Sequence, residues 1–107
     1  MFLYHYTRVE NVPSILEEGL IPDKGISMYY PETHTFKAGK LRENKVWLDT
    51  NLYRLKTKGT AVVTVDTKYL LPSKLEKYKS FGRTTHWYVY HGEIPPVAIR
   101  LYQKVEK

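Results

Sequence analysis

The sequence contains no cysteine among its 107 residues. This excludes disulfides, thiolate zinc sites and cysteine nucleophiles, and because it suits a reducing compartment we expect a cytoplasmic protein. The four histidines have neither HxxxH nor HExxH spacing, so we expect no metal site. No apolar run approaches the roughly 20 residues of a membrane span. The first residues lack the charged and apolar segments of a secretory leader, so we expect neither a membrane partner nor a leader.

Acidic residues are outnumbered by basic ones, 11 to 17, which gives a net charge of +6. Aromatic residues are abundant instead, at 14% of the chain, and ten of them are tyrosines. Positive charge with aromatic rings suits anionic, planar partners such as nucleotides or single-stranded nucleic acid. Lysines that keep a surface soluble and tyrosines that fill half-exposed sheet positions would give the same counts. Composition alone leaves both interpretations open.

Length and pattern predict one α+β domain over residues 1–107, with a mainly antiparallel sheet. A helix is expected over 10–18, with Asn11 as N-cap, Pro13 in its first turn and Gly19 just after its end. The segment 23–45 shows no periodicity and is expected to be a long loop. Helical turns are expected at 51–56 and 70–78, and a second loop at 80–85. Strands are expected at 2–7, 46–48, 60–66, 86–91 and 97–102.

Three short blocks resemble one known superfamily. Residues 3–7 (Leu-Tyr-His-Tyr-Thr) and 11–22 (Asn-Val-Pro-Ser-Ile-Leu-Glu-Glu-Gly-Leu-Ile-Pro) combine Tyr-His-x-Thr with a short helix that ends in Ile-Leu-x-x-Gly-Leu. This resembles the opening of the ADP-ribosyltransferase superfamily, above all the DarT-like DNA ADP-ribosyltransferases and more distantly the PARP catalytic domain and the RNA 2′-phosphotransferases. Residues 46–51 (Val-Trp-Leu-Asp-Thr-Asn) are similar to the start of the family's second motif. Residues 88–99 (Tyr-Val-Tyr-His-Gly-Glu-Ile-Pro-Pro-Val-Ala-Ile) resemble its closing hairpin.

The resemblance implies two small, bent, split sheets with NAD bound as a substrate in the cleft between them. It makes His5 the ligand of the ribose beside nicotinamide, Tyr6 a main-chain contact of the carboxamide, and Thr7 the hydroxyl that follows. Trp47 and Tyr53 correspond to aromatic residues that stack on nicotinamide. This assignment agrees with the chemistry of the nicotinamide ring, which is flat and cationic and is therefore bound well by aromatic faces.

The chain departs from the family at its catalytic glutamate. Alignment of the closing strand places His86 at that position, and the nearest carboxylate, Glu93, follows in the turn at the far end. Seven residues of extended strand span roughly 23 Å, so Glu93 cannot simply occupy the same place. His86 and Glu93 are therefore the candidate catalytic residues, and Arg42 and Arg83 are the candidate contacts of a phosphate-rich substrate.

These observations favour an NAD-dependent ADP-ribosyltransferase of the toxin or phage–host conflict type, with DNA or RNA as a candidate acceptor. Two alternatives stay open. One is an enzyme like the RNA 2′-phosphotransferases, which transfers phosphate to NAD. The other is a non-catalytic module that binds nucleotides or single-stranded nucleic acid through tyrosine stacking.

Overall fold

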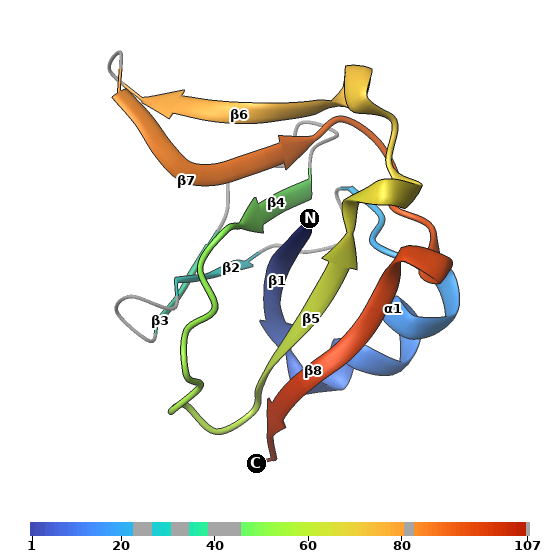
Figure 1. Ribbon diagram of the computed structural model, residues 1–107. Helices are drawn as coiled ribbons and strands as arrows, with labels where there is room; N and C mark the ends of the chain where they lie inside the picture. Colours follow the sequence, from blue (N-terminus) through green and yellow to red (C-terminus); the bar gives the residue numbers. More distant parts are fainter. Residues whose placement is uncertain (23–26, 31–34, 39–45, 81–82, 107) are drawn as a thin grey trace.

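A six-stranded antiparallel sheet forms the frame of the protein (Figure 1). The structure is a computed structural model that describes residues 1–22, 27–30, 35–38, 46–80 and 83–106, with side chains described for 1–22, 46–78 and 86–106. The strand order is β6-β7-β4-β1-β5-β8, and every neighbouring pair is antiparallel, which confirms the predicted α+β class. The strands are β1 (Phe2–Arg8), β4 (Val46–Asp49), β5 (Thr60–Asp66), β6 (Leu75–Ser80), β7 (Arg83–Tyr90) and β8 (Ile99–Val105).

The sheet consists of two halves that meet between β1 and β4. Strand β1 pairs with β5 along its whole length, from Phe2 opposite Asp66 to Arg8 opposite Thr60. With β4 it shares a single register pair, Tyr4 opposite Asp49. Figure 1 shows the consequence: β6 and β7 run across the top of the molecule, while β1, β5 and β8 run steeply below them.

Helix α1 (Val12–Glu18) covers one face of the sheet and follows a 3₁₀ turn, η1 (Val9–Asn11). Pro13 in the first turn and Gly19 after the last are as predicted. Asn11 occupies the N-cap position, but its side-chain amide donates to Oγ1 of Thr7 (3.2 Å) and caps no helical N–H. No helix among the described residues is long and apolar enough to cross a membrane. The core under α1 consists of Leu3, Ile15, Leu20, Val46, Leu48, Val63, Val65, Leu70, Tyr90, Ile94, Ala98 and Ile99.

The opposite face of β1 and β5 is covered by residues 50–59, which cross it without regular structure. Leu55 packs there against Tyr6 and Val62. The helical turn predicted at 51–56 is therefore wrong. The hydroxyl of Tyr6 accepts the backbone N–H of Tyr53 and an Asp49 oxygen accepts that of Asn51, so side chains from β1 and β4 bind the start of this segment, which has no helical structure.

Three other predicted segments differ from the structure. The predicted loop 23–45 contains a pair of antiparallel strands, β2 (Ser27–Tyr30) and β3 (Thr35–Ala38). The helical or turn segment predicted at 70–78 contains a 3₁₀ turn, η3 (Pro72–Lys74), but the residues after it form β6, because pairing with β7 fixes them as an edge strand. Strand β7 begins at Arg83, so the predicted loop 80–85 is also shorter. Two more 3₁₀ turns flank the sheet, η2 (Thr67–Tyr69) and η4 (Pro96–Ala98).

The first and last motif blocks, residues 11–22 and 88–99, are in contact just after the end of α1. Gly19 ends the helix with φ +88°, a left-handed conformation that glycine adopts without strain. The next residue, Leu20, exchanges two backbone hydrogen bonds with Ile94, at 3.0 and 2.9 Å. The Gly-Leu and Ile-Pro-Pro sequences thus have a structural role that is independent of any ligand.

Candidate functional site

His5 lies where the two halves of the sheet diverge. Its Nδ1 is 3.0 Å from the carbonyl oxygen of Trp47. A carbonyl only accepts, so Nδ1 carries the proton and Nε2 is left as an acceptor in the neutral ring. Burial lowers the pKa of His5, and the hydrogen bond to Trp47 opposes this only in part. A half-buried, neutral histidine that offers Nε2 suits an alcohol donor such as a ribose hydroxyl.

Asp49 ends β4 at the same junction, and its side chain is fully buried. Its Oδ1 accepts the N–H of Asn51 at 2.8 Å, and its Oδ2 lies 3.6 Å from Nε2 of His86 on β7. A buried carboxylate is costly unless hydrogen bonds or charges stabilise it. Asp49 is not among the site residues predicted from the sequence. The available signal was its position directly after an apolar strand and two residues before Asn51, which is the pattern of an Asx turn.

Three aromatic rings gather beside this pair, one each from β4, β6 and β7. Trp47 packs edge-on against Tyr78 (centroids 4.8 Å apart) and Trp87 (6.2 Å). The His86 ring lies 5.4 Å from Trp87. All these side chains are half-buried. Trp47 thus has a packing role in this half of the sheet, and the same surface offers rings to a planar ligand.

The hydroxyl of Tyr6 organises the segment that follows β4. It donates to the carbonyl oxygen of Asn51 (2.9 Å) and accepts the N–H of Tyr53 (2.7 Å). The Asn51 amide donates in turn to the hydroxyl of Tyr53 (3.1 Å), and the rings of Tyr6 and Tyr53 lie 6.2 Å apart. Tyr6 and Tyr53, predicted to contact NAD, therefore form one network with each other next to Asp49.

Removal of the Tyr6 hydroxyl is expected to destabilise the protein. Tyr6→Phe loses both hydrogen bonds at a position that is 7% exposed, so we expect a loss of about 1–3 kcal/mol in the free energy of unfolding. Urea denaturation measures this loss in the free energy of unfolding. Tyr102→Phe is the control, because Tyr102 is 57% exposed and its replacement should change stability by less than about 0.5 kcal/mol. Equal losses for the two variants would contradict the network.

Burial of His5 predicts a pH-dependent stability. Because the folded-state pKa of His5 lies below the unfolded value of about 6.5, the unfolded chain binds more protons as the pH falls. The contribution of His5 is therefore complete above about pH 6.5 and is lost below it, at no more than about 1.4 kcal/mol per pH unit. Denaturation of the wild type and of His5→Asn from pH 5 to 8 checks this. The wild type should gain stability relative to His5→Asn as the pH rises from 5 to about 6.5 and no more above it, and a stability difference independent of pH would refute the prediction.

The other predicted residues are distributed as follows. Thr7 is buried at the end of β1, where its hydroxyl accepts from Asn11, so its visible role is to join β1 to the helix. Glu93 is exposed in the turn after β7. Arg42 lies outside the described residues, and only the backbone of Arg83 is described, at the start of β7. The structure thus brings together His5, Trp47, His86, Tyr6 and Tyr53, adds Asp49, and leaves Glu93 apart.

Comparison with known proteins adds no relative: no protein family matches the chain, and no curated protein or solved structure is significantly similar to it. No group of three His, Asp or Glu side chains that could hold a metal ion occurs in the described part of the chain. The geometry of the site is therefore the basis for a functional proposal.

Proposed function

We propose that this protein is an NAD-dependent ADP-ribosyltransferase. One observation carries the proposal: the three sequence blocks that resemble this superfamily each include part of one of the adjacent strands β1, β4 and β7. Their candidate residues His5, Trp47 and His86 are linked there through the His5–Trp47 hydrogen bond and the register of β4 with β7. Strands β1 and β4 share a single register pair, and the sheet diverges there. This divergence supports the separation into two small sheets that the ADP-ribosyltransferase fold requires.

The chemistry of the junction supports the same reaction. Cleavage of the bond between nicotinamide and ribose builds positive charge on the sugar, so a site must hold the ribose and stabilise that charge. His5 would accept a hydrogen bond from a ribose hydroxyl at Nε2. The half-buried rings of Trp47 and Trp87 would contact the flat, cationic nicotinamide. The family's glutamate is absent, and Asp49 would supply negative charge to the site through His86, whose Nε2 lies 3.6 Å from its Oδ2.

A nucleic acid is the acceptor that the charge favours. The net charge of +6 attracts a polyanion, and the exposed side chains of Lys74 and Lys77 lie at the start of the β6–β7 hairpin, close in sequence to the site strands. Arg42 and Arg83 stay candidate contacts for its phosphates.

Nicotinamide release tests the proposal. The full chain is incubated with NAD, alone and with DNA or RNA oligonucleotides, and free nicotinamide and modified oligonucleotide are followed by chromatography. We expect release in both cases, with a higher rate and a mass increase of one ADP-ribose when the acceptor is present. NAD that binds and raises the melting temperature without release would indicate a binding module. A 2′-phosphorylated RNA that loses phosphate only with NAD would indicate the phosphotransferase instead.

A further inference from the structure

The pair formed by Asp49 and His86 resembles the orienting half of a general-base system. Asp49 is 0% exposed, while the His86 side chain is 36% exposed, so one member is sealed in the fold and the other reaches solvent. The carboxylate is itself held in place, because the N–H of Asn51 binds its Oδ1 at 2.8 Å. Its Oδ2 faces Nε2 of His86 at 3.6 Å. This separation is an ion-pair distance and not a hydrogen bond, so the carboxylate acts on His86 through its negative charge.

We infer that Asp49 positions His86 as the general base of the transfer reaction, and that the acceptor is a group whose proton must leave, an O–H or N–H rather than a carboxylate or phosphate. This inference rests on the proposed function and adds the acceptor class to it. A carboxylate or phosphate attacks as an anion and needs no base. A hydroxyl or ring N–H is a poor nucleophile until its proton is removed, and the pair supplies for that purpose a histidine at ion-pair distance from a carboxylate.

The step balances as a single displacement. The acceptor oxygen or nitrogen bonds to C1′ of the nicotinamide ribose, and the electron pair of the N–C1′ bond leaves with neutral nicotinamide. The acceptor proton passes to the imidazole ring of His86, and the imidazolium that forms is stabilised by the negative charge of Asp49, whose Oδ2 lies 3.6 Å from Nε2. The proton then returns to solvent through the exposed edge of the ring. No oxidant, metal or further reactant is needed.

Other carboxylates in the described part of the chain are less suited to this role. Glu93 is exposed in a turn beyond the end of β7. Glu76 lies 3.8 Å from Nε2 of His91, but both side chains are largely exposed, at 67% and 40%. A surface pair of this kind is screened by water and is worth little. The contrast between the Asp49–His86 pair and the exposed Glu76–His91 pair therefore provides an internal control.

Nucleophiles with and without a proton test the inference. The full chain reacts with NAD in water, in water with methanol, and in water with sodium azide, and each product is quantified by mass spectrometry. Water and methanol must lose a proton, whereas the azide anion forms its bond to C1′ without any proton transfer. His86→Gln and Asp49→Asn should lower the water and methanol products by about 100-fold or more and leave the azide product within a few-fold of wild type.

Three controls make the result decisive. His91→Gln should leave all three products unchanged, because it alters the exposed pair only. His86→Gln tests the same idea at a half-exposed position if the buried Asp49→Asn variant does not fold. The double variant should be no slower than either single variant, since both remove one base.

Each outcome has a separate meaning. Equal losses with all three nucleophiles would show that the pair serves binding or folding, and unchanged rates would show that it serves neither; both overturn the inference and leave the proposed function standing. A wild type that releases nicotinamide with none of them overturns the proposed function, and the inference falls with it.

Discussion

Replacement of His5 by alanine is expected to lower nicotinamide release from NAD by about 100-fold or more. The ring stands at the divergence of β1 from β4, and its hydrogen bond to the Trp47 carbonyl oxygen fixes the neutral tautomer that presents Nε2. In the proposed reaction Nε2 holds the ribose whose C1′ becomes positively charged, and loss of one preorganised contact to a transition state costs two to three orders of magnitude. Steady-state release of nicotinamide measures the effect.

Asparagine at the same position separates a ligand role from a structural one. The amide N–H of His5→Asn can replace Nδ1 as donor to Trp47, while nothing replaces Nε2. We therefore expect His5→Asn to retain most of the wild-type stability above pH 7 and to be as inactive as His5→Ala. An asparagine variant with near wild-type turnover would mean that His5 only ties β1 to β4, and the ribose contact would have to be assigned elsewhere.

The part of the fold that sequence predicts well is the part determined by local pattern. Strand β5 is nearly continuous in β-branched residues and lies buried between β1 and β8, as its composition indicates. Strand β6 is the opposite case. Its residues, Leu-Glu-Lys-Tyr-Lys-Ser after a proline, follow no apolar alternation, and only pairing with β7 makes them a strand. An edge strand with charged residues carries little local signal.

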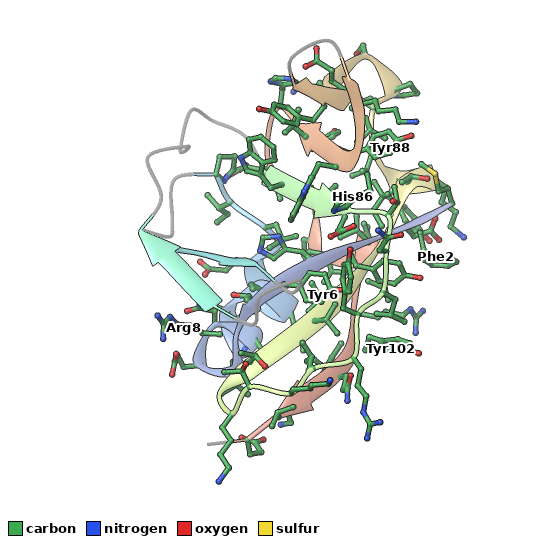
Figure 2. The ribbon with its side chains drawn as sticks, turned by 90° about the vertical axis from the view of Figure 1, so that its left-hand side faces the viewer. Phe2, Tyr6, Arg8, His86, Tyr88 and Tyr102 are labelled. Atoms are coloured by element: carbon green, nitrogen blue, oxygen red, sulfur yellow. The ribbon has the colours of Figure 1, made fainter. Side chains whose placement is uncertain are left out.

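The candidate site divides in the same way. His5 and Trp47 were predicted because each stands in a recognisable short block, and His86 because alignment of the closing strand places it at the position of the family's glutamate. Asp49 was missed because its significance depends on two non-local facts, the register of β4 with β7 and the bend that brings His86 to its carboxylate. No sequence pattern in the segment 46–51 predicts that Asp49 is fully buried. In the view of Figure 2, His86 lies above the ribbon of β1 and Tyr6 lies below it.

Replacement of Gly19 by alanine is expected to be the most destabilising single-methyl change in the described part of the chain. Gly19 has φ +88°, and a Cβ there would collide with the carbonyl oxygen of Ile94 and lie 3.2 Å from its carbon and from Cδ of Pro96. All three atoms belong to backbone or to a rigid ring, so none can move aside cheaply. The left-handed conformation and the overpacking each cost about 1–3 kcal/mol. We expect a loss of about 3 kcal/mol or more, measured by urea denaturation, and a melting temperature lower by about 10–20 °C.

Gly92→Ala is the matched control. Gly92 also has a positive φ (+152°), but the nearest atom to an added Cβ is Nζ of Lys74 at 3.4 Å, the end of a flexible side chain. Backbone strain is thus present at both glycines, and the steric clash only at Gly19. We expect Gly92→Ala to lose about 1–2 kcal/mol. Similar losses at the two sites would mean that the φ angle alone requires glycine at position 19. A larger loss at Gly19 would mean that the close passage of the helix end over Ile94, through which the first and last motif blocks are joined, requires it.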